Sequence, residues 1–295
     1  MEKTITNPFL LQDQTVSLAQ IELPKELRNK VVNLQCESVK GTCNVYLVGT
    51  CHVSSQSCKD VEAIISLLKP EVVFLELCKS RSHFLHPQAP RLQEMPRFTD
   101  GMVGMWKRNN SNAFETLGSL VMEKSGKELG VVPGSEFQSA YREVKKYGGK
   151  VILGDRPIKI TCQRTWSKMS FWYKTKFVFI SLLMLATTSL ASLDMEVNNQ
   201  VIDREFPSMA ETLTHERDLY MASRLLEVAK ECKSVVAVVG SAHVPGIQKN
   251  WRKPIAIESL MEVRATTSSS AMKLWTTVAL AAGGIAFFSV SRLKR

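Results

Sequence analysis

Two histidines follow apolar stretches of the same kind, nearly two hundred positions apart in the sequence. His52 closes the stretch Val45-Tyr-Leu-Val-Gly-Thr-Cys-His, and His243 closes Val235-Val-Ala-Val-Val-Gly-Ser-Ala-His. Short β-branched runs of this kind are typical of buried strands in a parallel sheet. The glycine three residues before each histidine allows a sharp turn at the strand end. We therefore expect both imidazoles at the carboxyl edge of one sheet, where open α/β sheets bind their ligands.

Two further predicted strands end in charged residues. The run that ends at Glu76 is followed by Leu-Cys-Lys-Ser-Arg81, and the run that ends at Gly154 is followed by Asp155 and Arg156. If all four strands belong to one parallel sheet, their carboxyl ends meet at the same edge. Two imidazoles, two carboxylates and two guanidinium groups would then converge on one place.

This predicted edge contains the ligand set of a catalytic metal. Two histidines and a carboxylate commonly hold Zn²⁺ or a similar divalent ion, and they leave one position open for water. We therefore take His52, Glu76 and His243 as candidate catalytic residues and as candidate ligands of Zn²⁺, Mn²⁺ or Co²⁺. Such a metal would lower the pKa of its bound water and polarise a carbonyl group. The same residues can instead serve a metal-free site in which a histidine is the general base.

Arginines at the same edge suit an anionic group on a substrate. Arg81 and Arg156 carry a permanent charge and a fork of donors that matches a carboxylate or a phosphate. We include both among the candidate catalytic residues. Asp155, Glu216 and Arg217 are secondary candidates, the last two because they open a predicted helix that leads into the final strand.

Each of these residues also has a purely structural interpretation. His52 alone would fit a helix cap or a core position, Glu76 could pair with Arg81, and Asp155 with Arg156 could form a simple turn. Glu216 suits the first turn of a helix, because a carboxylate is favourable at the positive end of the helix dipole. The repetition of Gly-x-x-His behind two matching strands favours a common site.

The order of the predicted elements indicates a doubly wound α/β domain. The expected strands are Val31 to Val39, Val45 to Gly49, Glu71 to Glu76, Lys150 to Gly154 and Val235 to Gly240, the first two joined by a turn around Lys40 to Asn44. The expected helices are Ser54 to Lys69, Pro133 to Tyr147, and one capped by Thr214 that continues to Ala229. The predicted fold class is α/β: a small, mainly parallel sheet flanked by helices, with a large helical insertion over 83–149 and a C-terminal transmembrane helix.

Composition suits a globular domain followed by a membrane segment. The 295 residues are 44% apolar and 22% charged, and the net charge is +10. There is no zinc finger and no basic stripe interleaved with aromatic residues, so nucleic acid is not an expected partner. The seven cysteines follow no signal peptide and no Cys-x-x-Cys pattern, which predicts reduced thiols in a cytosol-facing domain. We expect a loosely ordered lead-in over 1–30, the α/β domain over 31–262, a linker over 263–272 and a membrane segment over 273–291.

Leu274 to Val290 contains no charged residue and lies between Lys273 and Arg292. A helix of this length spans about 25 Å, which approaches the thickness of a hydrocarbon core. Few residues follow it, so we predict a tail anchor that inserts after synthesis and leaves the domain in the cytosol. A short, moderately apolar span with a basic end is typical of the mitochondrial outer membrane. The endoplasmic reticulum and the peroxisome are the alternatives.

A second apolar stretch, Phe177 to Leu193, contains several serines and threonines. If it alone crossed a bilayer, His52 and His243 would lie on opposite sides of the membrane. Because the matching strands indicate one sheet, we predict a buried or groove-lining helix here. A membrane-facing surface is the alternative.

At these residues the sequence resembles the TraB/PrgY family of TraB domain-containing proteins. The resemblance lies in six stretches that occur in the family's order: Leu47-Val-Gly-Thr-Cys-His-Val-Ser54, Val73-Phe-Leu-Glu-Leu-Cys-Lys-Ser-Arg81, Pro133-Gly-Ser-Glu-Phe-Gln-Ser-Ala140, Leu153-Gly-Asp-Arg-Pro157, Glu216-Arg-Asp218 and Val239-Gly-Ser-Ala-His-Val-Pro-Gly246. It is strongest to eukaryotic members, some of which carry a C-terminal membrane span.

The resemblance extends to a wider group that includes Tiki-type metalloproteases, GumN proteins, ChaN-like proteins and erythromycin esterases. It implies a small parallel sheet with two Gly-x-x-His histidines and a glutamate at the site, here His52, His243 and Glu76, supported by Arg81 and Arg156. It also implies a divalent-metal-dependent hydrolase of a peptide or ester bond. The alternative is a non-catalytic adaptor that tethers the mitochondrial outer membrane to another organelle or takes part in mitochondrial quality control.

Overall fold

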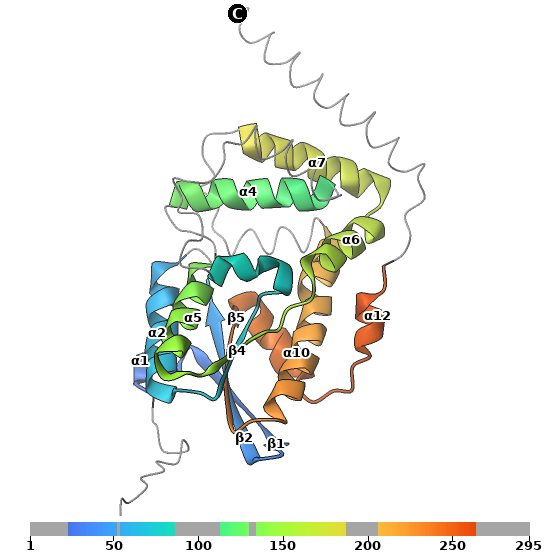
Figure 1. Cartoon of the computed structure of the whole chain (residues 1–295). Coiled ribbons are helices and arrows are strands. Elements are labelled where there is room, and N and C mark those ends of the chain that lie inside the picture. Colours follow the sequence, from blue (N-terminus) through green and yellow to red (C-terminus); the bar gives the residue numbers. More distant parts are fainter. Residues whose placement is uncertain (1–22, 52–53, 86–112, 130–133, 187–205, 264–295) are drawn as a thin grey trace, which may run out of the picture.

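The computed structural model of the chain describes residues 23–51, 54–85, 113–129, 134–186 and 206–263. Within these ranges five strands form one sheet in the order β1-β2-β5-β3-β4 (Figure 1). The strands are β1 (Val31–Ser38), β2 (Gly41–Thr50), β3 (Val72–Leu75), β4 (Lys150–Leu153) and β5 (Ser234–Gly240). The predicted mixed α/β class is confirmed.

Four of the five strands run parallel, and only β1 pairs with its neighbour in the antiparallel direction. In register, Thr50 of β2 lies beside Gly240 of β5, and Leu75 of β3 lies beside Leu153 of β4. The carboxyl ends of β2, β5, β3 and β4 therefore share one edge of the sheet. Edge strand β1 carries no predicted site residue.

The turn between the first two strands is tighter than we expected. β1 continues to Ser38 and β2 already begins at Gly41, so the stretch from Gly41 to Asn44 belongs to the strand and not to the turn. Gly41 has a positive φ of 99°. The serine hydroxyl at position 38 accepts a hydrogen bond from the backbone N–H of Lys40. Two residues, Val39 and Lys40, connect the strands. The hairpin can close this tightly because Gly41, at the start of β2, tolerates a positive φ.

Helices cover both faces of the sheet (Figure 1). α2 (Ser55–Leu68) and α5 (Ser135–Tyr147) pack on one face and bury Val61, Ile64, Ile65, Leu68, Phe137, Ala140 and Val144 against the strands. α10 (Glu216–Ala229) and α11 (Val244–Asn250) pack on the other face, and they bury Met221, Ala222, Leu225, Ala229 and Ile247 together with Trp251, which follows α11. The all-buried strands β3 and β5 lie between these two layers, which explains their unbroken apolar runs.

The ends of two predicted helices can be compared with the structure. α2 begins after Ser54, whose hydroxyl accepts a hydrogen bond from the Ser57 N–H, and it ends at Lys69 in the left-handed conformation before Pro70. The expected cap at Thr214 is wrong. α10 continues the helical turns of α9 (Pro207–Met209) and η3 (Ala210–His215), so Thr214 lies inside a helical run.

A smaller group of helices packs around its own apolar cluster. α4 (Ala113–Leu129), α6 (Ile158–Lys168) and α7 (Phe171–Ala186) contribute to this cluster together with α9. Its buried members are Phe114, Cys162, Met169, Phe206 and Met209. α4 and α7 pack against each other beyond one end of the sheet (Figure 1). The remaining described elements are α1 (Lys25–Arg28), η2 (Lys79–Leu85), η4 (Ser241–His243) and α12 (Ile257–Met261).

The second apolar stretch forms a surface helix over its described part. α7 buries Val178 and Ser181, but it exposes Phe179 and Leu183. The prediction of a buried or groove-lining helix is therefore wrong for one of its two faces. Across the described ranges, no helix combines the length and apolar character that a membrane span requires. Leu274 to Val290 and most of the expected lead-in lie outside the described residues.

Candidate functional site

Three of the four predicted strand ends contribute to one buried charged cluster. Glu76, Asp155 and His243 follow β3, β4 and β5, and each is less than a tenth exposed. They meet around the guanidinium group of Arg217, from the first turn of α10. His52 lies outside the described residues; β2, which precedes it, ends at Thr50 on the same edge.

Arg217 joins two carboxylates that come from different strands. Its Nε and one terminal nitrogen donate to the two oxygens of Asp155 at 3.0 and 2.9 Å, and the same terminal nitrogen donates to Glu76 Oε1. The other terminal nitrogen donates to the Leu213 carbonyl at 3.0 Å. Such forked, charge-assisted bonds are strong and geometrically specific. Burial lowers the pKa of Arg217, but the charges of Asp155 and Glu76 raise it by more, so this cation is permanent.

His243 is held on both sides of its ring by carboxylates. Its Nδ1 lies 2.6 Å from Asp218 Oδ1, and its Nε2 lies 3.2 Å from Glu76 Oε1. Nε2 is also 3.1 Å from a terminal nitrogen of Arg217. These last two contacts require opposite states, because Arg217 can only donate whereas the Glu76 carboxylate can only accept.

The surrounding charges decide between these two states of His243. Burial lowers the pKa of His243 and Arg217 lowers it further, but Glu76 and the hydrogen bond to Asp218 outweigh both and raise the pKa to about 9. The imidazolium therefore donates from Nδ1 to Asp218 and from Nε2 to Glu76 at neutral pH. With Arg81 and Arg217, it balances the three carboxylates of the cluster.

Asp218 is a buried member of the cluster that the sequence analysis named only within the family stretch Glu216-Arg-Asp218. It is 2% exposed, and burial raises the pKa of its carboxyl group while the bond to His243 opposes that shift. The position was recognisable, because Asp218 falls in register with the buried residues Ala222, Leu225 and Ala229 of α10. A carboxylate on the apolar face of a helix requires a buried partner. Gly246 makes the contact possible, because a Cβ there would lie 1.9 Å from Asp218 Oδ2.

Two further hydrogen-bond donors approach the cluster. The backbone N–H of Gly240, at the end of β5, donates to Glu76 Oε2 at 2.6 Å. A terminal nitrogen of Arg81 donates to Asp155 Oδ2 at 2.5 Å, and the Arg81 side chain is 27% exposed. Its buried Nε has no hydrogen-bond partner among the described residues. Arg81 is therefore the cluster cation most accessible to a ligand.

Arg156 lies elsewhere than we expected for a residue that contacts substrate. Its side chain is 0% exposed, and it donates to Thr161, Glu216, Leu260 and Thr212. Glu216 also accepts from Arg164 and Lys168, and these cations lower the pKa of Glu216 to about 2, although burial raises it. Arg156 is therefore an internal anchor between α6, α10 and α12. Its backbone N–H donates to Asp155 Oδ1, which helps to hold that carboxylate.

The described residues do not fit a divalent metal ion as they are arranged. No group of three or more His, Cys, Asp or Glu side chains in the described ranges is placed to hold a metal, and these ranges do not include His52. The Arg217 guanidinium already contacts Glu76 Oε1 and lies beside His243 Nε2. A divalent ion bound to those two atoms would therefore lie against a permanent positive charge.

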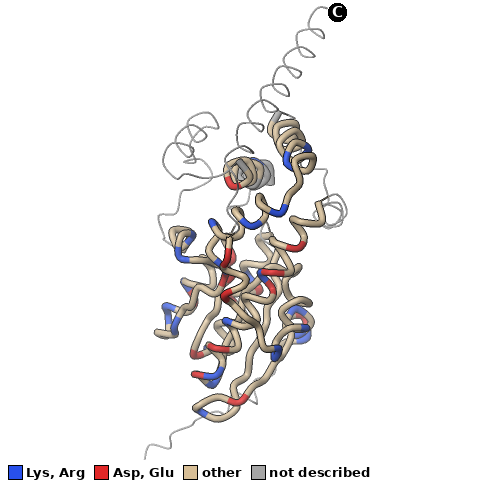
Figure 2. The backbone as a smooth tube through the Cα atoms, turned by 90° about the vertical axis from the view of Figure 1, so that its right-hand side faces the viewer, with Lys and Arg blue, Asp and Glu red and all other residues tan. Residues whose placement is uncertain are grey.

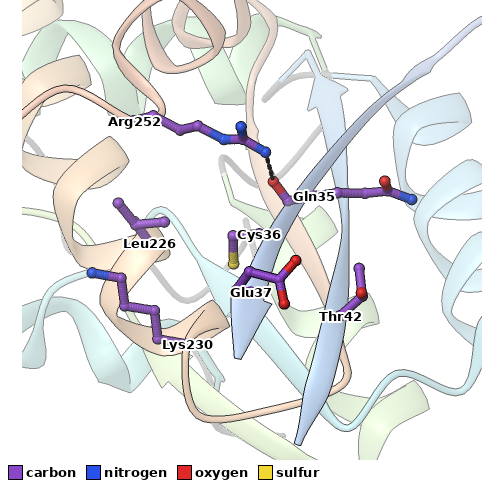
Figure 3. Close-up of a pocket in the computed structure, with 7 residues that line it drawn as sticks. All are labelled: Gln35, Cys36, Glu37, Thr42, Leu226, Lys230 and Arg252. Carbon is purple, nitrogen blue, oxygen red and sulfur yellow. Dashed lines mark hydrogen bonds between the residues drawn. The ribbon is translucent and has the colours of Figure 1, made fainter. Parts of the chain in front are cut away.

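A pocket of 440 Å³ lies away from this cluster, beside the free edge of β1 (Figure 3). It is lined by Glu37 from β1, by Leu226 and Lys230 near the end of α10, and by Arg252, whose guanidinium group donates to the Gln35 carbonyl. Thr42, at the amino end of β2, also lines it. The pocket is therefore at the opposite end of the sheet from Glu76. Its position does not support a connection with the charged cluster.

The fold and the cluster together define an α/β protein with a buried Glu–Arg–Asp–His site at the carboxyl edge of a largely parallel sheet. A profile of the TraB/PrgY/gumN family matches residues 37–200 and 182–255, which include every strand end described above. The chain belongs to the TraB/PrgY/gumN family.

Relatives from animals and an archaeon share most of the chain. The TraB domain-containing protein of Bos taurus is 30% identical over 266 residues, which cover 81% of this chain and 71% of that protein. The TraB domain-containing protein of Homo sapiens is 31% identical over 246 residues, which cover 74% of this chain and 65% of that protein. An uncharacterized protein of Methanocaldococcus jannaschii is 35% identical over 222 residues, covering 72% of this chain and 54% of that protein.

Proposed function

We propose that the chain is a hydrolase that cleaves a peptide or ester bond at the cluster of Glu76, Asp155, Arg217 and His243. The observation that carries this proposal is the direct contact of His243 Nε2 with Glu76 Oε1 between two strand ends, with Glu76 held by Arg217 and His243 oriented by Asp218. An acid and a base held within hydrogen-bond reach are the elements of general acid–base catalysis. Because Glu76 and His243 are both buried, their charges act more strongly on a bound carbonyl group than they would in water.

In this proposal each residue has a stated part in the reaction. Glu76 accepts a proton from the water that attacks the carbonyl carbon, and the His243 imidazolium gives a proton to the leaving oxygen or nitrogen. Arg81, which presents a partly exposed guanidinium group, binds the carbonyl oxygen or a carboxylate of the substrate. Asp218 and Asp155 are positioning residues, because they hold His243 and the two arginines.

A divalent metal held by His52, Glu76 and His243 is the alternative form of this proposal. The Asp218–His243 bond favours it, because metal-binding histidines commonly donate their second nitrogen to a carboxylate. The position of Arg217 opposes it. Metal analysis distinguishes the two forms without knowledge of the substrate.

The hydrolase proposal is tested with isosteric variants and a panel of fluorogenic ester and peptide substrates. Glu76→Gln is compared with Glu71→Gln, which removes a carboxylate just before the opposite end of the same strand, where it pairs with Lys40. Loss of the general base should lower the rate by about a hundredfold or more, whereas Glu71→Gln should retain activity. Equal rates in both variants, with both folded by circular dichroism, would reject Glu76 as a catalytic residue.

We also propose that Leu274 to Val290 anchors the chain in the mitochondrial outer membrane with the domain in the cytosol. The uncharged run and its basic flanks support this proposal. A fluorescent protein fused to the last thirty residues should label mitochondria; labelling of the endoplasmic reticulum or peroxisomes would redirect the assignment, and a diffuse signal would reject the anchor.

If Glu76→Gln keeps all biological activity in cells while removal of residues 272–295 abolishes it, the chain is an adaptor or tether and not a hydrolase.

A further inference from the structure

α7 carries a concentration of exposed apolar side chains. The described residues include seven exposed large hydrophobic side chains, and four of them are on this helix: Phe171, Trp172, Phe179 and Leu183. Trp172 is 72% exposed, more than any other aromatic residue in that group. Single exposed hydrophobic residues are ordinary, but a group on one helix marks an interaction surface.

Three of these residues form one stripe along the helix. Trp172, Phe179 and Leu183 are spaced by seven and four positions, so they share one face over a length of about 16 Å. Val178 and Ser181 are buried, and Phe177 packs on Phe114 of α4 with ring centroids 4.8 Å apart. α7 is thus fixed to the molecule on one side and presents an apolar stripe on the other.

The charged residues of α7 are all basic (Figure 2). Residues 157–193 contain no aspartate or glutamate, and the charged residues of α7 are Lys174 and Lys176, while Glu115 lies on the neighbouring helix α4. The amines of the two lysines lie 5.2 Å from the Trp166 ring and 5.3 Å from the Phe206 ring. A helix with aromatic and aliphatic residues on one face, and lysines but no carboxylates at its other positions, is typical of a helix that lies in the interface of an anionic membrane.

The end of the described chain lies next to the same group of helices. The Arg164 side chain of α6 donates to the carbonyl oxygens of Ser259 and Glu262, and α6 leads directly into α7. Only ten residues separate Val263 from Leu274. Ten residues reach at most about 35 Å, so a bilayer that holds Leu274 to Val290 is within reach of this end of the domain.

We propose that α7 lies on the surface of an anionic phospholipid bilayer and inserts Trp172, Phe179 and Leu183 at the level of the lipid head groups. This proposal rests on the proposed membrane anchor. The anchor would provide the attachment, and α7 would set the orientation of the domain on the membrane. Trp is well suited to this position, because its ring is apolar and its N–H can remain hydrated.

The test uses the full chain with vesicles of phosphatidylcholine and phosphatidylserine, some of them containing brominated phosphatidylcholine as a quencher. The difference in fluorescence between the wild type and Trp172→Phe gives the signal of Trp172. The same difference for Trp251→Phe gives the signal of a buried tryptophan, which is the control, and the difference for Trp275→Phe gives the signal of the tail. We expect the Trp172 signal to shift to shorter wavelength and to be quenched at least twofold, while the Trp251 signal is unchanged. In a Phe179→Ser/Leu183→Ser variant, the quenching of Trp172 should be largely lost.

The outcomes separate this proposal from the proposed anchor. If the Trp275 signal is quenched and the Trp172 signal is not, the anchor stands and the membrane contact of α7 is rejected. If the chain does not float with the vesicles, the anchor fails and the proposal fails with it. A Trp172 shift that appears without vesicles and grows with protein concentration would assign the stripe to a second copy of the chain, which also overturns the proposal.

Discussion

Replacing Glu216 with glutamine should destabilise the fold strongly at neutral pH and much less in acid. Glu216 is 6% exposed and accepts hydrogen bonds from Arg156, Arg164 and Lys168. Its pKa is lowered to about 2 from an ordinary value of 4.5. A shift of this size corresponds to about 3 kcal/mol of stability. That agrees with the cost of about 3–5 kcal/mol for removing one partner of a buried ion pair.

The pH dependence has a definite sign. Because the folded-state pKa of Glu216 is depressed, its contribution is complete above pH 4.5 and is lost as the pH falls toward 2. The difference in unfolding free energy between the wild type and Glu216→Gln should therefore fall from about 3 kcal/mol at pH 7 to about 1.4 kcal/mol at pH 3. Lys168 is 30% exposed, so solvent weakens its interaction with Glu216. The cost of Glu216→Gln at pH 7 should therefore lie at the lower end of the range of about 3–5 kcal/mol for a buried ion pair.

Urea unfolding at the two pH values measures this difference. Glu227→Gln, on the same helix, is the matched control, because Glu227 and its partner Arg224 are both exposed and their pair should contribute little. A cost below 1 kcal/mol at pH 7, or a cost that does not change between pH 7 and pH 3, would refute the assignment of Arg156 and Glu216 as a buried anchor.

Two further substitutions test the geometry around His243. The pKa of His243 is raised to about 9 from 6.5, so its contribution to stability is complete below pH 6.5 and is lost as the pH rises through 9; the stability difference between the wild type and His243→Gln should shrink by about 3 kcal/mol between pH 6 and pH 10, and a constant difference in urea unfolding would contradict the charged state. Gly246→Ala would place a Cβ 1.9 Å from Asp218 Oδ2 and should lower stability by about 1–3 kcal/mol. Gly118→Ala, where a Cβ meets nothing within 4 Å, should melt at the same or a higher temperature, and equal melting of the two variants would contradict the close contact.

The arrangement of the strands was predictable because their residues carry a simple signal. Each central strand is an unbroken apolar run, and it is unbroken because helices cover both faces of the sheet. The parallel direction of β2, β3, β4 and β5 then places their carboxyl ends at one edge. The convergence of Glu76, Asp155 and His243 follows from this pattern alone.

The direction of a side chain beyond a strand end was not predictable in the same way. Asp155 and Arg156 are neighbours in the sequence, yet Asp155 faces Arg217 and Arg156 is directed into a separate buried network with Glu216. The residues at the centre of the cluster, Arg217 and Asp218, could not be recognised as such from the strand pattern. Arg217 and Asp218 belong to a helix, and only the packing of that helix on the sheet brings them to His243.

The burial of α7 could not be judged from its apolar content. A helix that is buried on all sides and a helix that exposes one apolar face to solvent or lipid can have the same apolar content. What distinguishes α7 is that α4 covers only one of its sides. That information comes from residues distant in the sequence.

The central proposal is that Arg217 and the His243 imidazolium balance the charges of Glu76, Asp155 and Asp218, so that the proposed reaction needs no bound metal. The most direct test is the metal content of the purified full chain, measured by mass spectrometry after exposure to Zn²⁺, Mn²⁺ and Co²⁺ and removal of free ions. We expect far less than one ion per chain, with the same low value in His243→Gln. One ion per chain in the wild type that is lost in both His243→Gln and Glu76→Gln would contradict the claim and establish the metal-dependent form of the site.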